Sequence, residues 1–172
     1  MMSDKPIELI IDESVINSND VFKIIEPLWW SVNIYDGDDQ YYSNLSRFTK
    51  RQQQVFAIEW YLAEVNNGGH DQFYYNSTGI VWEEALNGFK EMELIEFFEL
   101  IKESTIRLGG TPSKDRELRQ EQLDKYKPYF GDLDEKLYEI EDKLQLHLME
   151  YIKRNQTDFL FKGEIMVPKD FR

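Results

Sequence analysis

Hydrophobic residues recur at three- and four-residue steps along most of the chain, which is the spacing of one face of an α-helix. The clearest series lies in the last third, where Leu133, Leu137, Ile140 and Leu144 follow one another in this way. Alternation of apolar and polar residues, the pattern of a half-buried strand, is scarce. The pattern therefore predicts an all-α fold: one compact multi-helix domain over residues 1–172, with short connecting loops and a docked C-terminal tail.

Start and stop signals divide this pattern into elements. Thr49 followed by Gln52 predicts a capping box for a helix over 50–65, and because that segment is apolar on all sides we place it at the centre of the fold. Pro27 predicts a kink or a late start in a helix over 21–35. The other expected elements are helices over 79–89, 91–108, 113–127 and 132–152, a loop over 35–48 and a short extended arm over 157–171.

The chain is strongly acidic, with 33 Asp and Glu against 20 Lys and Arg, a net charge of −13 and a pI near 4.6. Residues 1–48 carry nine acidic and three basic side chains, residues 49–110 ten and five, and residues 111–172 fourteen and twelve. We therefore expect a negative surface mainly from the first two-thirds. Its sign argues against direct nucleic-acid binding and favours a basic partner. Acidity that serves solubility alone is the open alternative.

Several classes of chemistry lack the residues that they need. The chain has no cysteine, which excludes disulfides, thiolate nucleophiles and cysteine-based metal sites. It shows no membrane-spanning apolar run and no secretory signal, which predicts a cytoplasmic protein. The two histidines, His70 and His147, lie far apart, and no nucleophile elbow or phosphate-binding glycine loop is present. We therefore expect no catalytic residue, no metal and no cofactor, with an acid–base cluster of Glu59, Glu64, His70 and Asp71 as the alternative.

A row of carboxylates on the expected helix over 91–108 is the first candidate for a partner-binding surface. At 100° per residue, Glu93, Glu96, Glu99 and Glu103 fall within about a third of the helix circumference, opposite a packed apolar face. Neighbours three or four residues apart lie about 5–6 Å from each other, on the order of the phosphate spacing along one DNA strand. The row therefore predicts either a phosphate-like surface or an ordinary solvated face.

A second acidic group, Asp36, Asp38 and Asp39, lies in the expected loop over 35–48. These carboxylates lack the alternating order and the distal Glu of a calcium-binding loop, so they predict a polar turn and not a metal site. We include the three residues in the candidate acidic surface.

The stretch EVNNGGHDQFYYNSTG, residues 64–79, gathers amides and glycines around three aromatic residues. In a structural interpretation the preceding helix ends at Asn66–Asn67, and Gly68–Gly69 provide a turn with positive φ. Asp71 then caps a short aromatic segment, and a hydroxyl of Ser77–Thr78 caps the next helix. The amide side chains would satisfy backbone groups that the helix ends leave unpaired.

This stretch also resembles the signature of the DNA-mimic-protein (DMP) family of bacterial proteins. The resemblance includes the flanking segments VFAIEWYLA and IVWEEALNGF and extends from about residue 24 to the tail. The signature residues, which we interpret as structural, are Glu64, Asn66, Asn67, Gly68, Gly69, Asp71, Gln72, Phe73, Asn76, Ser77 and Gly79. The resemblance implies an all-helical fold that is commonly dimeric. It also implies an acidic surface that imitates DNA phosphates and occupies the DNA-binding face of a transcription factor.

These observations lead to one functional hypothesis and two alternatives. The hypothesis is a non-enzymatic acidic interaction protein, a DNA mimic that uses surface carboxylates to bind a basic partner such as a DNA-binding protein or transcription factor. It needs no nucleic acid, membrane or cofactor, and the resemblance allows a homodimer. The first alternative is a small-molecule-binding or enzymatic domain whose pocket is lined by Asn66, Asn67, His70, Gln72 and Asn76. The second is an immunity or anti-nuclease module.

Overall fold

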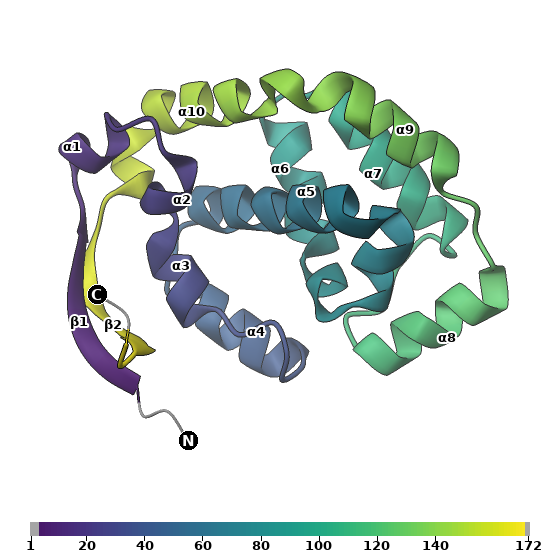
Figure 1. Ribbon diagram of the computed structural model, residues 1–172, viewed down its shortest axis with the longest axis horizontal. Coiled ribbons are helices and arrows are strands. Elements are labelled where there is room, and N and C mark those ends of the chain that lie inside the picture. Colours follow the sequence, from purple (N-terminus) through teal and green to yellow (C-terminus); the bar gives the residue numbers. More distant parts are fainter. Residues whose placement is uncertain (1–3, 171–172) are drawn as a thin grey trace.

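The computed structural model describes residues 4–170, which are mostly helical with one pair of strands (Figure 1). β1 (Asp4–Ile11) and β2 (Phe161–Pro168) pair antiparallel, so segments from the two ends of the chain lie side by side. The all-α prediction is therefore correct for most of the described chain and wrong for these two segments. The extended arm expected in the tail is β2, whereas β1 was not predicted.

Both strands alternate between more buried and more exposed positions. Ile11 of β1 and Ile165 and Val167 of β2 are buried, while the residues next to them along each strand are more exposed. The register pairs Ile7 with Ile165, so the apolar side chains of both strands share one face. β2 contacts α3 (Glu26–Ser31), which ties the strand pair to the helices.

The helical elements follow one another with short connections. In chain order they are α1 (Glu13–Ile16), α2 (Val21–Ile24), α3 (Glu26–Ser31), α4 (Asp38–Leu45), α5 (Lys50–Tyr75), the 3-10 turn η1 (Ser77–Val81), α6 (Trp82–Glu91), α7 (Ile95–Arg107), α8 (Arg116–Tyr126), α9 (Gly131–Ile140), the 3-10 turn η2 (Glu141–Lys143), α10 (Leu144–Arg154) and the 3-10 turn η3 (Gln156–Phe159).

Two differences from the predicted boundaries concern the candidate acidic groups. The expected loop over 35–48 contains α4, because Asp38 and Asp39 occupy a first helical turn, where the helix dipole favours carboxylates. The expected helix over 91–108 begins only at Ile95, because the chain turns at Glu93, whose φ is +58°.

The break expected at Pro27 lies between α2 and α3, and η2 divides the expected last long helix into α9 and α10.

α5 is the central helix, and it begins as predicted. The Thr49 side chain accepts a hydrogen bond from the Gln52 backbone N–H (3.2 Å), and Gln52 Oε1 accepts one from the Thr49 backbone N–H (2.9 Å). These two bonds form the predicted capping box. The helix does not end near Val65 as expected: it bends at Gly68–Gly69 and continues to Tyr75.

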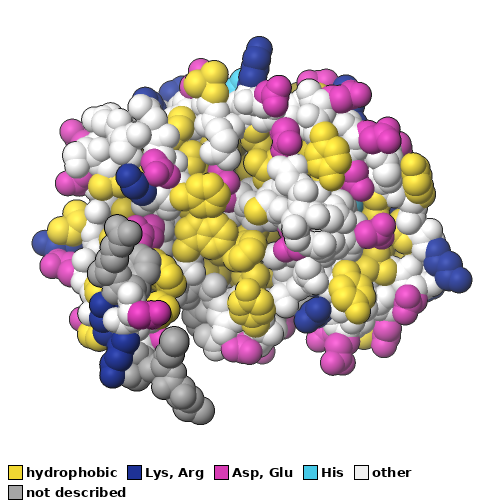
Figure 2. Space-filling view, in the orientation of Figure 1, with side chains coloured by type: hydrophobic (Ala, Val, Ile, Leu, Met, Phe, Trp, Pro, Cys, Tyr) yellow, Lys and Arg dark blue, Asp and Glu magenta, His cyan; other side chains and the backbone are white. Residues whose placement is uncertain are grey.

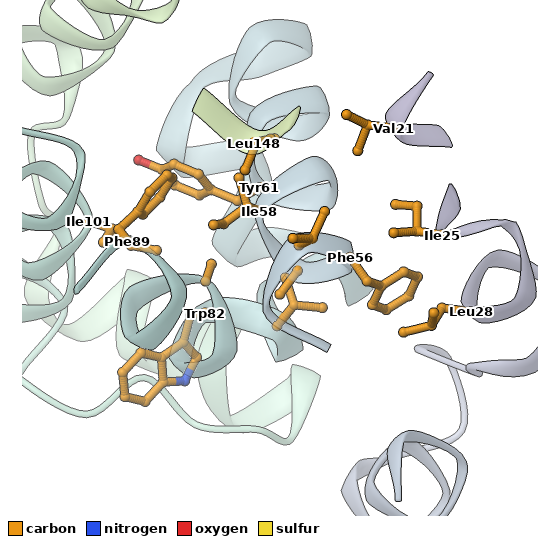
Figure 3. Close-up of a cluster of buried hydrophobic side chains, with 14 of the residues drawn as sticks. Val21, Ile25, Leu28, Phe56, Ile58, Tyr61, Trp82, Phe89, Ile101 and Leu148 are labelled. Carbon is orange, nitrogen blue, oxygen red and sulfur yellow. The ribbon is translucent and has the colours of Figure 1, made fainter. Parts of the chain in front are cut away.

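Both sides of α5 are packed against other helices, as Figure 3 shows. Phe56 lies near Ile25 and Leu28 on one side, while the Tyr61 ring lies 5.8 Å from that of Phe89 of α6 on the other. All five side chains are fully buried, and burying a side chain of this size contributes about 1.5–3 kcal/mol. α5 therefore joins the N-terminal helices to the α6–α10 half, and residues 64–79 at its far end lie against α8 and α9.

Candidate functional site

Residues 64–79, here named the signature corner, form the bend of α5 and the turn that follows it. Gly69 has a φ of +75°, and a Cβ there would lie 2.4 Å from Asp134 Oδ2 of α9. Gly68 has an extended φ of −161°, and a Cβ there would lie 2.0 Å from Gln72 Oε1. The predicted positive-φ turn is therefore correct for Gly69 and wrong for Gly68, where glycine makes room for a side chain instead.

His70 is fully buried in the corner, and both ring nitrogens have partners. Asp134 Oδ1 accepts hydrogen bonds from the His70 backbone N–H (2.9 Å) and from Nδ1–H (2.5 Å). His70 Nε2 is hydrogen-bonded to the Tyr61 hydroxyl, at 2.7 Å. Asp134 therefore caps the second part of α5 from another helix, and the prediction that Asp71 supplies this cap is wrong. Asp71 is exposed.

The amide side chains of the corner are mostly bonded within the protein. Glu64 Oε1 accepts hydrogen bonds from Gln72 Nε2 (2.5 Å) and Asn76 Nδ2 (2.8 Å). Asn66 Nδ2 donates to Glu141 Oε2 (2.7 Å), whereas Asn67 is exposed. Of the five residues predicted to line a ligand pocket, four thus have internal partners, which favours the structural interpretation of the signature.

The second predicted cap of the corner is also wrong. The Thr78 hydroxyl donates to the Phe73 carbonyl (3.3 Å), and α6 begins at Trp82, after η1, without a side-chain cap. Phe73 is fully buried, with its ring 5.2 Å from that of Tyr61. Ser77 and Gly79 lie in η1, so the signature corner ends in a 3-10 turn and not in a helix start with a side-chain cap.

Arg119 of α8 has a structural role that was not predicted from the sequence. It is fully buried, and its guanidinium donates to the backbone carbonyls of Tyr74 (2.7 Å) and Asn76 (2.6 Å) at the end of α5 and of Ser113 (2.8 Å) before α8. Burial lowers the pKa of Arg119 to about 10. A Cβ on Gly79 would lie 2.4 Å from Arg119 Nε, so this signature glycine makes room for the arginine.

A shallow groove of about 620 Å³ runs between the end of α5 and α8. It is lined by Gly68, Asp71, Gln72, Tyr75, Asn76, Leu123, Asp124, Lys127 and Pro128. The pocket alternative thus retains only Gln72 and Asn76 among its five residues, and both use their amide groups to bond Glu64.

Three members of the alternative acid–base cluster bond residues outside it. Glu59 bonds Gln145 of α10 (2.7 Å), Glu64 bonds the amides of the corner, and His70 bonds Asp134. No group of three or more metal-ligating side chains is present in residues 4–170. Within that range, no helix is long and apolar enough to cross a membrane.

We name Glu93, Glu96, Glu99 and Glu103 the carboxylate row. Its first member lies in the turn before α7 and not on the helix, which corrects the prediction of four residues on one helix face. Glu93, Glu96 and Glu99 are exposed and have no ion-pair partner within 4.0 Å among residues 4–170. These three carboxylates are therefore available to a cation from outside the chain.

Glu103 differs from the rest of the row, because its carboxylate pairs with an arginine of the same chain. Its carboxylate pairs with Arg107 Nε (3.0 Å), and Arg107 also forms two hydrogen bonds to Asp132 of α9 (2.6 and 2.8 Å). Bonding to these carboxylates raises the pKa of Arg107, and the arginine lowers the pKa of Asp132. Glu103 therefore belongs to the contact between α7 and α9.

The second predicted acidic group lies on a different part of the molecule. Asp36 accepts a hydrogen bond from Asn33 Nδ2 (2.6 Å), and Asp38 accepts one from the Asp39 backbone N–H (3.0 Å). All three carboxylates are exposed. Figure 1 places α4 and α7 on different sides of α5, so these residues and the carboxylate row do not form one continuous surface.

Acidic side chains on the face drawn in Figure 2 are spread among basic, apolar and uncharged ones. They are more frequent along the edge that α8 and α9 occupy in Figure 1. These helices belong to the last third of the chain, which we did not expect to contribute strongly to a negative surface. The carboxylate row is therefore one local feature of a broadly acidic molecule.

The fold and this site define a mostly helical protein with a closed, hydrogen-bonded corner and unpaired surface carboxylates. The chain belongs to the DMP19-like protein family, whose model matches residues 46–155. This confirms the family resemblance, and the matched range contains both the signature corner and the carboxylate row. Searches of curated proteins and of solved structures found no match.

Proposed function

We propose that this protein binds a basic, DNA-binding protein by presenting surface carboxylates in place of DNA phosphates, and that it performs no catalysis of its own. The observation that carries the proposal is the group Glu93, Glu96 and Glu99: three exposed carboxylates at the start of α7 and in the turn before it, without an ion-pair partner among residues 4–170. Membership of the DMP19-like family and the net charge of −13 support it independently.

The geometry of α7 explains how such a group can attract a cationic surface. Glu96 and Glu99 are three residues apart on one helix, so their Cβ atoms are separated by about 5–6 Å. One ion pair at 4 Å in a water-like medium contributes about 1 kcal/mol, so several pairs are needed for a stable complex. Exposed pairs are screened over about 8–10 Å at ordinary salt, and binding should weaken as salt rises.

Neutralising the row tests this proposal. The variant Glu93→Gln, Glu96→Gln, Glu99→Gln should capture much less basic protein from a cell extract at low salt than the wild type does. The matched control carries Glu117→Gln, Glu121→Gln and Asp124→Asn, three exposed carboxylates of α8, and changes the net charge by the same amount. The readout is quantitative mass spectrometry of captured proteins at low salt and at about 0.5 M salt.

The proposal predicts loss of capture in the row variant alone and release from the wild type at high salt. Equal loss in both variants would show that total charge matters and the row does not. If no basic protein is enriched at low salt, the proposal is wrong. The identity of a captured protein, a transcription factor or a nuclease, then distinguishes transcription-factor mimicry from the anti-nuclease alternative.

A further inference from the structure

An apolar groove borders the carboxylate row where α7 begins. It has a volume of about 330 Å³ and is lined by Ile95, Glu96, Glu99 and Leu100 of α7 and by Lys136 of α9. Ile95 and Glu99 are four residues apart, as are Glu96 and Leu100, so the two pairs lie side by side along the helix. Two members of the row thus stand at the edge of an apolar depression.

The apolar part of this groove is open to solvent in the isolated chain. Ile95 is 59% exposed, although it is the first residue of a well-packed helix. Leu100 is 7% exposed and belongs to the core, so it forms a fixed floor beside Ile95. An exposed isoleucine next to a rigid apolar floor gains free energy only if another apolar group covers it.

Charge around the groove indicates what kind of group covers it. Glu96 and Glu99 have no ion-pair partner among residues 4–170, whereas Lys136, on the opposite wall, pairs with Glu139 (3.7 Å). The unpaired charge at the rim is therefore negative. A second copy of this chain would bring another net charge of −13 to this rim, while a basic partner would be attracted to it.

We infer that this groove receives an apolar side chain from a helical segment of the basic partner, while Lys or Arg residues beside that side chain pair with Glu96 and Glu99. This inference rests on the proposed function and extends it. The row would supply attraction that depends on salt, and the groove would supply contact area that does not. The partner segment is therefore amphipathic as well as basic.

Two synthetic helical peptides test the inference with the full-length chain. One contains Lys and Leu on adjoining faces, and the other has every Leu replaced by Ala, which keeps the charge and the helix propensity. Fluorescence anisotropy of the labelled peptides gives both dissociation constants. We expect the wild type to prefer the Leu peptide by about tenfold, equivalent to about 1.4 kcal/mol.

Two variants of α7 show whether the groove causes the preference for the Leu peptide. Ile95→Ser should largely remove the preference for the Leu peptide without changing binding of the Ala peptide. Ile106→Ser is the matched control, because Ile106 lies on the same helix, is 55% exposed and does not line the groove. The control should keep the wild-type preference.

Each contrary result has a distinct meaning. Equal affinity for the two peptides, or equal effects of both isoleucine variants, overturns the groove inference and leaves the proposed function intact. If Glu96→Gln with Glu99→Gln weakens neither peptide, the proposed function fails as well. If sedimentation shows that Ile95→Ser converts a dimer into a monomer, the groove is an interface between copies of this chain, and the inference is wrong.

Discussion

Glu59 and His70, two buried ionisable residues of α5, have very different surroundings. His70 bonds a carboxylate and a tyrosine hydroxyl, so both of its ring nitrogens are satisfied. Glu59 is 2% exposed and bonds Gln145 Nε2 (2.7 Å), with no charged neighbour that shifts its pKa. Burial raises the pKa of Glu59 from the ordinary 4.5 to about 7, and the bond from Gln145 only partly opposes this change.

The raised pKa predicts that stability depends on pH. Because the folded protein holds the Glu59 proton more tightly than the unfolded chain, stability falls as pH rises from about 4.5 to about 7 and then levels off. Glu59→Gln removes this contribution and should be more stable than the wild type above pH 7, by about 3 kcal/mol, with little difference near pH 4.5. Chemical denaturation across this range measures both curves.

An exposed carboxylate provides the control for this pH experiment. Glu121→Gln on α8 changes the net charge by the same amount and should leave the pH dependence of stability unchanged. If Glu59→Gln keeps the wild-type slope between pH 4.5 and pH 7, Glu59 is not the group that titrates there.

At the scale of elements, the bend in α5 depends on a contact with α9. Gly69 combines a positive φ with close approach to Asp134, the same carboxylate that caps the second part of the helix at His70. A side chain at this position would therefore strain the backbone and also displace the cap. The bend thus links the positions of α5 and α9.

Gly69→Ala should lower the free energy of unfolding by about 3 kcal/mol, since it adds backbone strain and breaks the hydrogen bonds of a buried carboxylate–histidine pair. Gly110→Ala separates the two effects, because Gly110 also has a positive φ (+94°) but nothing within 4 Å of its Cβ position. We expect only about 1 kcal/mol for that variant. Similar losses in denaturant titrations of the two variants would show that the Asp134 contact contributes nothing.

The sequence predicted the elements whose signals are local. The capping box of Thr49 and Gln52, the break near Pro27 and the positive φ of Gly69 follow from neighbouring residues alone, and all are present. β1 was missed because Ile7, Leu9 and Ile11 alternate over only a few residues, and their pairing partners lie 150 or more residues away along the chain.

The parts of the site that sequence did not predict depend on contacts between distant segments. Asp134 caps α5 and Arg119 closes the corner, although Asp134 was expected only near the start of the last long helix and Arg119 lies in a highly charged segment. Gly79 was the one residue in the sequence that could have indicated the Arg119 contact. A glycine next to an aromatic segment indicates that another group approaches the backbone closely, and here that group is the Arg119 side chain. Glu103 looked like its neighbours in sequence, and only the fold pairs it with Arg107.

For the whole molecule, the net charge of −13 sets the sign of any electrostatic partner, and the local arrangement decides where that partner binds. The face in Figure 2 carries carboxylates over several helices, so long-range attraction does not need the row. Glu93, Glu96 and Glu99 are exposed and have no ion-pair partner among residues 4–170, and Glu96 and Glu99 are neighbours on one helix. We therefore propose that the whole surface steers the partner and that the row makes the specific contact.

Competition with DNA shows whether these carboxylates occupy the DNA-binding face of the partner. A basic protein captured by this chain is mixed with a labelled DNA duplex that it binds, and the chain is then titrated in at low salt. We expect that the wild type displaces the duplex and that the variant with Glu93, Glu96 and Glu99 changed to Gln displaces it much less. A ternary complex, in which duplex and chain occupy the captured protein together, would contradict the claim that these carboxylates take the place of phosphates.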